Sequence, residues 1–187
     1  MNSRAILLII GLCPLLIFAQ EKPFLANVIP HYAKLQYAGS IGFLSVGVGY
    51  ETKNKKFQGD VMYGYVPKTL GGITIHSFTG KLTWIPVTYT RHSIRINFIT
   101  AGILVNYVLG HQYFSFSPEN YPFDYYDFPT ALHAGLFAGG AISKGKLGVY
   151  YELGTTDAEF ISFLGNTRSV NFTDILHIGA GIRISLK

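Results

Sequence analysis

Strict alternation between apolar and polar residues is the feature that most constrains the fold of this chain. Between residues 176 and 186, the even positions are apolar and the odd positions are polar or glycine. Successive side chains of a β-strand point to opposite faces of the sheet, so a period of two indicates a strand with one apolar face. Helical bundles and coiled coils need a period of about 3.6 residues and are therefore disfavoured.

The alternation predicts eight strands, at residues 31–38, 41–51, 57–66, 73–86, 94–109, 130–143, 146–155 and 173–186. The apolar positions of the fifth segment change phase, which predicts a β-bulge near Ile99 or Thr100. Several segments exceed a typical globular strand and match the roughly 9–11 residues of a tilted membrane-spanning strand. We therefore expect an all-β fold, an eight-stranded antiparallel up-and-down transmembrane β-barrel.

The connections between these segments fall into two length classes. Residues 52–56, 87–93 and 144–145 form the shorter ones, whereas residues 111–129 and 156–172 form long ones. Outer-membrane barrels have short periplasmic turns and long external loops. With both termini in the periplasm, the two long connections fall on the external side, together with the tight turn at residues 39–40.

Alternation alone does not say which face points outward, and a soluble lipocalin-like barrel that carries lipid in an apolar lumen is the alternative. Charged residues make up only 13% of the chain, about half the usual share for a soluble domain. The polar positions are mainly Gly, Ser, Thr, Gln, Asn and His, which suit a narrow barrel interior. We expect the apolar faces to contact lipid, with interfacial aromatic girdles that include Tyr32, Tyr50, Tyr65, Trp84, Tyr107 and Tyr151.

The N-terminus has the layout of a cleavable signal peptide. A single cation, Arg4, precedes an apolar run over residues 5–18, and the small residue Ala19 follows. We predict a signal peptide at residues 1–19 and one barrel domain at residues 20–187, located in the outer membrane of a Gram-negative bacterium. The only cysteine, Cys13, lies in the leader, so the mature chain has no thiol chemistry.

Nucleic acid is not an expected partner, although the formal net charge is +5. The 15 Lys and Arg residues are scattered, apart from a small cluster at residues 53–56. The predicted contacts are outer-membrane lipid and another envelope protein. We predict no cofactor, and the loop acids at 119, 124, 127 and 157 lack the regular spacing of a metal site.

Several segments resemble the lipid A 3-O-deacylase family of small outer-membrane barrels. They are residues 35–50, the triplet 76–78 and the triplet 101–103. The resemblance implies an outer-membrane hydrolase with a His-x-Ser pair near the end of its seventh strand and an acid in its eighth. Leu153 and Thr155 stand where that pair is expected, and His177 or Asp174 stands where the acid is expected. The resemblance therefore extends to the fold and not to the deacylase mechanism.

An eight-stranded barrel encloses a lumen that side chains essentially fill, which excludes a general diffusion pore. On the predicted strands, six charged residues point inward and are expected to form ion pairs, because buried charges need partners. They are Lys34, Asp60, Lys81, Arg95, Glu152 and Arg183.

The segment with the most unusual composition is 111–130, which is rich in aromatic residues and has no Lys or Arg. Tyr and Phe supply rigid amphipathic contact area, so we predict a docking surface for another envelope protein; a lid over the barrel mouth is the alternative. The predicted contact residues are Tyr113, Phe114, Phe116, Tyr121, Phe123, Tyr125, Tyr126 and Phe128.

The sequence thus predicts a non-enzymatic outer-membrane barrel with a structural or partner-binding role. The alternative is a lipid A or phospholipid acyl ester hydrolase with an atypical site at Glu152, Thr155, Asp174 and His177. Inward His133 could join that site. His76 and Ser77 are excluded as a base and nucleophile pair, because consecutive strand residues point to opposite faces.

Overall fold

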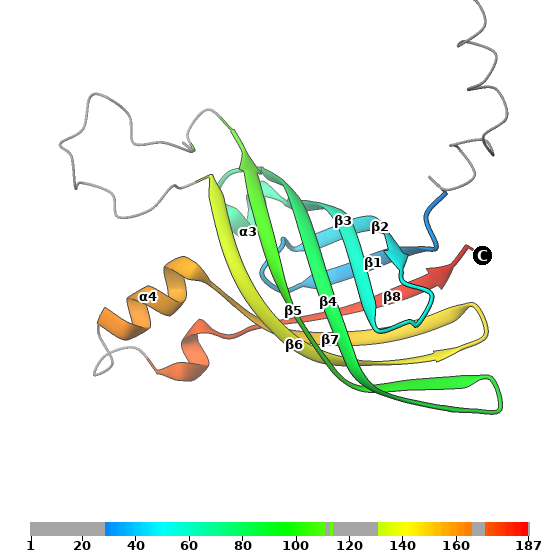
Figure 1. Cartoon of the computed structure of the whole chain (residues 1–187). Helices are drawn as coiled ribbons and strands as arrows, with labels where there is room; N and C mark the ends of the chain where they lie inside the picture. The colour runs from blue at the N-terminus through cyan, green and yellow to red at the C-terminus, as the bar shows by residue number, and fades with distance from the viewer. Residues whose placement is uncertain (1–28, 111–112, 114–130, 166–170, 187) are drawn as a thin grey trace, which may run out of the picture.

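The computed structural model describes residues 29–110, 113, 131–165 and 171–186, which form a closed barrel (Figure 1). Each strand pairs in antiparallel fashion with the next, and β1 pairs with β8 to close the sheet. This confirms the expected all-β, eight-stranded up-and-down barrel. The strands are β1 (Tyr32–Ala38), β2 (Leu44–Glu51), β3 (Phe57–Val66), β4 (Ile75–Arg91), β5 (Ile94–Leu109), β6 (Leu132–Lys144), β7 (Leu147–Thr156) and β8 (His177–Ser185).

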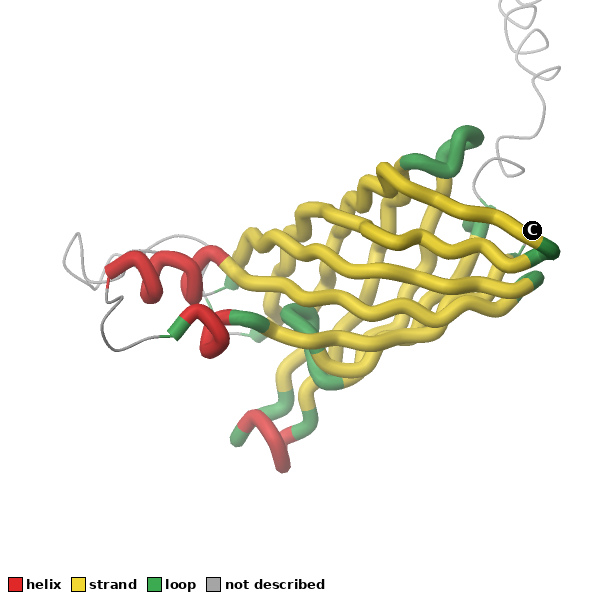
Figure 2. The backbone as a smooth tube through the Cα atoms, turned by 90° about the horizontal axis from the view of Figure 1, so that it is seen from below, coloured by secondary structure: helices red, strands yellow, loops and turns green. Residues whose placement is uncertain are grey.

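The two ends of the barrel differ in their connections (Figures 1 and 2). One end, here called the helical end, carries α3 (Lys68–Gly71), α4 (Asp157–Gly165) and the short helix η2 (Phe172–Ile175). The other end, the terminal end, carries the C-terminal residues of β8 and the turns at residues 52–56, 92–93 and 145–146. Among the described residues, no helix is both long and apolar enough to cross a membrane.

Three predicted strand boundaries differ from the structure by three or more residues. Strand β4 continues to Arg91, so its turn to β5 consists of His92 and Ser93, whose φ angles of 46° and 66° suit a tight hairpin. Strand β2 begins only at Leu44, because the chain turns through left-handed backbone at Gly39 (φ 86°) and Gly42 (φ 138°). Strand β8 begins at His177, because η2 occupies the residues before it.

Two irregularities interrupt the strand pairing. The register between β5 and β6 shifts between Asn97 and Thr100, which confirms the bulge expected near that point. The pairing of β4 with β5 also shifts between Trp84 and Thr88. Pro86 lies within this second irregularity and has no N–H to donate to the ladder. The residue that explains the second shift was therefore visible in the sequence.

The apolar faces of the strands point away from the barrel axis. Leu136 and Ile178 are 62% and 67% exposed, whereas the polar side chains of Gln36, Ser45 and Thr79 are almost completely buried inside. This distribution is the reverse of a soluble carrier barrel, which has an apolar lumen and a polar exterior.

One of the aromatic residues expected at the interface lies elsewhere. Tyr50, Tyr65, Trp84, Tyr107 and Tyr151 are exposed on the outer face, but Tyr32 is fully buried in the lumen. It shares the inward face of β1 with Lys34 and Gln36, because these residues are two and four positions further along the strand.

Candidate functional sites in the lumen and at the rim

An apolar cluster fills the lumen toward the helical end. Ile41, Met62, Leu104 and Phe137 are all at most 5% exposed and contact one another. Phe137 has room because Gly102 faces it across the strand pair: a Cβ on Gly102 would lie 2.5 Å from Phe137 Cζ. We call these four residues the apolar plug.

Two buried ion pairs occupy the middle of the lumen. Lys34 Nζ lies 2.7 Å from Asp60 Oδ2, and Lys81 Nζ pairs with Glu152. Tyr32 donates its hydroxyl proton to Asp60 Oδ1 at 2.7 Å. Each charge thus meets an opposite charge, which offsets the cost of removing both from water.

Lumen aromatic rings also cover the two lysines. Lys34 Nζ lies 5.0 Å from the centre of the Tyr150 ring, and Lys81 Nζ lies 4.4 Å from that of Phe137. An ammonium group over a ring face gains cation–π attraction, especially where water is excluded. Together, the apolar plug and the two covered ion pairs fill much of the middle of the barrel.

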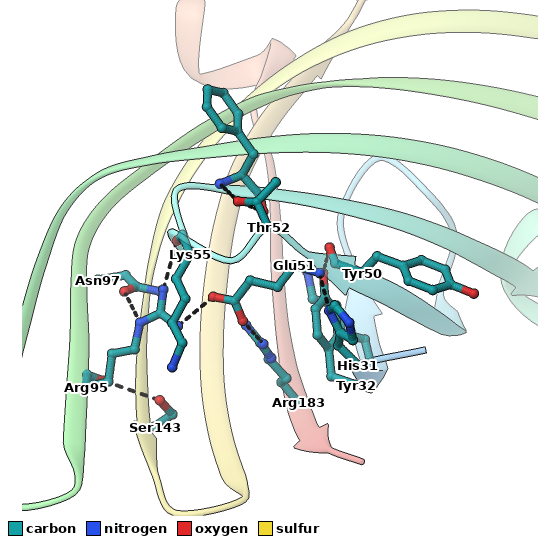
Figure 3. Close-up of polar contacts among 12 residues, drawn as sticks. His31, Tyr32, Tyr50, Glu51, Thr52, Lys55, Arg95, Asn97, Ser143 and Arg183 are labelled. Atoms are coloured by element: carbon teal, nitrogen blue, oxygen red, sulfur yellow. Dashed lines mark hydrogen bonds and ion pairs between the residues drawn. The ribbon is translucent and has the colours of Figure 1, made fainter. Parts of the chain in front are cut away.

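The other two predicted cations, Arg95 and Arg183, meet at an acid that sequence reasoning missed (Figure 3). Each oxygen of the Glu51 carboxylate binds one guanidinium, with Arg95 Nη1 and Arg183 Nη2 both at 2.6 Å. The strand pattern contained the signal, because Val46, Val48 and Tyr50 point outward and Glu51 must then point inward. We call Glu51, Arg95 and Arg183 the arginine cluster.

Both arginines of the cluster are held in place by further contacts. Arg95 donates from Nε to Asn97 Oδ1 at 3.2 Å and from Nη2 to the Lys55 carbonyl at 3.0 Å. Arg183 lies over the Tyr32 ring, with its Cζ 3.8 Å from the ring centre. These contacts hold both guanidinium groups at the terminal end of the lumen (Figure 3).

A cavity of about 640 Å³, lined largely by polar residues, lies between the two ion pairs and the turns of the terminal end. The arginine cluster lines it, and so does Thr83, a residue that is 4% exposed. The Thr83 hydroxyl has no hydrogen-bond partner among the residues that the structure describes. Further lining residues include Lys34, Lys55, Lys56, Gln58, Asn97, Ser143, Lys146, Tyr150 and Glu152. We call this space the terminal cavity.

The four residues of the alternative hydrolase site make different contacts, although Glu152 and His177 line one small space in the lumen. Glu152 pairs with Lys81, whereas Asp174 accepts a hydrogen bond from the Asn171 backbone N–H at 3.1 Å and so caps η2. The Thr155 hydroxyl contacts the neighbouring carbonyl of Thr156. His177 instead lies 2.5 Å, from Nε2 to Oε1, from Glu159 of α4.

Two histidine–carboxylate pairs join α4 to the rim at the helical end. His177 pairs with Glu159, and His133 Nδ1 lies 3.2 Å from Asp157 Oδ1. Glu159 was not predicted as a site residue, because the segment 156–172 was expected to be a long external connection. Ser40 lines the same rim cavity, of about 380 Å³, as His177. The buried Ser40 hydroxyl has no hydrogen-bond partner within the described part of the chain.

His76 and Ser77 lie on opposite faces of β4, as expected. His76 Nδ1 lies 2.5 Å from the hydroxyl of Tyr63 on the outer face, and Ser77 donates to the Ile41 carbonyl at 3.1 Å in the lumen.

Most of the predicted aromatic contact segment lies outside the described residues. Of its eight predicted contact residues, the structure describes Tyr113, whose N–H donates to the Gly110 carbonyl at 3.1 Å. The predicted signal peptide also lies outside them. Within the described ranges, no group of three or more His, Cys, Asp or Glu side chains is placed to hold a metal ion.

No protein-family model matches the chain, and no curated protein matches its sequence. The resemblance to lipid A 3-O-deacylases therefore depends on the short segments quoted above. The closed barrel itself is compatible with a small outer-membrane protein.

Proposed function

We propose that this protein is an integral barrel of the Gram-negative outer membrane with a structural or partner-binding role and no pore activity. The observation that carries the proposal is the outward apolar face, which runs over all eight strands, while most of the polar and charged strand side chains are buried inside. Exposed apolar patches of this extent are unfavourable in water, whereas hydrocarbon accepts them. The closed sheet also satisfies the backbone hydrogen bonds, as a bilayer requires.

Cell fractionation and electrophoresis test the membrane assignment. The protein is expected in the outer-membrane fraction, to need detergent for extraction and to migrate differently before and after boiling. Recovery of a detergent-free monomer from the periplasm would contradict the proposal and favour the soluble lipid carrier.

The filled lumen supports the absence of pore activity. The apolar plug and the two buried ion pairs occupy an interior that is barely wide enough for side chains in any eight-stranded barrel. Planar bilayers that contain the purified protein should show no stable conductance steps at neutral pH. Steady single-channel currents from the unmodified protein would disprove a non-pore role.

The partner-binding role is assigned to the aromatic segment 111–130, on the basis of its composition. A photoreactive amino acid placed at Phe116 or Phe123 should crosslink to one defined envelope protein in living cells. The same probe at Leu164, exposed on α4, serves as the matched control. Identical crosslinking patterns at all three positions would show that the segment makes no specific contact.

One observation favours a second candidate, acyl ester hydrolysis of lipid A or phospholipid. His177 pairs with the Glu159 carboxylate and lines the rim cavity together with Ser40, whose buried hydroxyl makes no hydrogen bond to His177 or to any other described residue. A serine, a histidine and an acid together have the chemistry of an acyl transfer site. In that reaction Ser40 Oγ would attack the ester carbonyl while its proton passes to His177 and then to the departing alcohol. Water would release the acid and restore the serine.

Mass spectrometry of outer-membrane lipids distinguishes the two candidates. Hydrolysis predicts lipid A or phospholipid that lacks one acyl chain in expressing cells, and loss of this product with Ser40→Ala. Lipid spectra that match those of cells without the protein would eliminate the hydrolase. Loss of product with Thr155→Ala but not with Ser40→Ala would instead favour the site expected from the sequence.

A further inference from the structure

The terminal cavity has an excess of positive charge at its mouth. The cations Lys55, Lys56 and Lys146 are exposed there, next to Arg95 and Arg183, and Glu51 is the acid among them. The deeper charged groups that line the cavity, Lys34 and Glu152, already have opposite partners in Asp60 and Lys81. A concave space with uncompensated cations raises the local concentration of anions.

The two arginines that line the cavity are suited to binding an anion and not only to attracting it. Arg183 lies over the Tyr32 ring, and Arg95 is anchored by Asn97 and the Lys55 carbonyl, so contacts already hold both guanidinium groups in place. Guanidinium groups bind carboxylate and phosphate oxygens through paired N–H donors. Held in this way, they lose little conformational entropy when an anion arrives.

Thr83 supplies a second and independent indication of a ligand. Its hydroxyl is buried in the cavity wall and has no hydrogen-bond partner in the described residues. Buried polar groups are normally satisfied, and an orphan hydroxyl beside a polar space is commonly satisfied by water or by a ligand. Thr83 and the arginine cluster line the same cavity.

We propose that the terminal cavity binds the phosphate or carboxylate group of a small solute that enters from the terminal end. In this proposal the Glu51 carboxylate is the internal competitor, because it already occupies one donor of each arginine with the geometry of an anionic ligand. An incoming oxyanion binds against the repulsion of Glu51, so its affinity is held low. The proposal depends on the cavity alone and does not require the membrane orientation or the role proposed above.

Titration of the detergent-solubilised protein with inorganic phosphate, followed by calorimetry at neutral pH and low ionic strength, tests the site. Acetate in a parallel titration shows whether carboxylate binds as well as phosphate. Glu51→Gln keeps the size of the side chain and removes its charge, so phosphate affinity should rise by about tenfold, the equivalent of one modest charge interaction. Arg183→Gln should lower it by at least that factor.

Two further sets of variants make the outcome unambiguous. Lys55→Gln and Lys146→Gln change exposed residues at the mouth, so they should fold normally and weaken phosphate binding several-fold. Lys68→Gln removes one cation at the helical end and should change nothing. An unmodified protein that binds neither anion, or a Glu51→Gln variant with unchanged or weaker affinity, would overturn the proposal.

Discussion

Arg183 and Glu51 lie 132 residues apart in the chain, yet Arg183 Nη2 is 2.6 Å from Glu51 Oε2. Arg183 belongs to β8 and Glu51 to β2, and β1 lies between these two strands. The ion pair therefore spans the seam where the first and last strands close the barrel. The same ion pair also lines the terminal cavity, so residues that help to close the barrel form part of the cavity wall.

Glu51→Gln is expected to destabilise the barrel by about 1–3 kcal/mol, because it leaves two partly buried guanidinium groups without a counter-charge. This loss of unfolding free energy is smaller than that expected for a fully buried ion pair, because solvent can enter the terminal cavity. Reversible urea unfolding in lipid vesicles measures the difference. Thr52→Ala, at an exposed residue in the adjoining turn, serves as the control and should cost less than Glu51→Gln.

The Lys81–Glu152 pair predicts a strong coupling in a double-mutant cycle. Either Lys81→Met or Glu152→Gln alone should cost about 3–5 kcal/mol, because each leaves one buried group without its partner. Both changes together should cost clearly less than the sum of the two single changes. Additive losses in the free energy of unfolding would mean that the two charges do not interact in the folded protein.

Tyr32 tests the other buried ion pair of the lumen, which joins Lys34 and Asp60. Tyr32→Phe removes only the hydroxyl that donates to Asp60 Oδ1 at 2.7 Å and keeps the ring beneath Arg183. A hydrogen bond to a charged group contributes about 1.5–3 kcal/mol, so the unfolding free energy should fall by that amount. Tyr151→Phe, on the exposed outer face, is the matched control and should be nearly neutral. Equal effects of the two substitutions would show that the hydrogen bond from Tyr32 to Asp60 does not stabilise the protein.

The barrel could be predicted because its determinants are local. Alternation fixed which side chains of β7 and β8 share a face, and the change of phase in β5 located its bulge. The arginine cluster could not be located in the same way, since the approach of Glu51 to Arg183 depends on the register between strands at opposite ends of the chain.

The pairing of His177 with Glu159 was missed for a different reason. The segment 156–172 was expected to be a loop, whereas α4 occupies residues Asp157–Gly165. Asp157 and Glu159 lie in the first turn of that helix, where acidic side chains are favoured by the helix dipole. That signal was present in the sequence, but the position of α4 against His177 of β8 depends on tertiary packing.

Lysine substitutions on the outer face test whether hydrocarbon surrounds the barrel. Leu136 and Ile178 are both more than 60% exposed, so a lysine at either position would be harmless if water covered that face. In a bilayer, the same change costs about 2–4 kcal/mol near the midplane of a transmembrane barrel. We therefore expect Leu136→Lys and Ile178→Lys to lower the free energy of unfolding in lipid vesicles by that amount. Leu164→Lys, equally exposed on α4 beyond the strands, should leave it unchanged. If all three variants were as stable as the unmodified protein, lipid would not contact the apolar faces of β6 and β8.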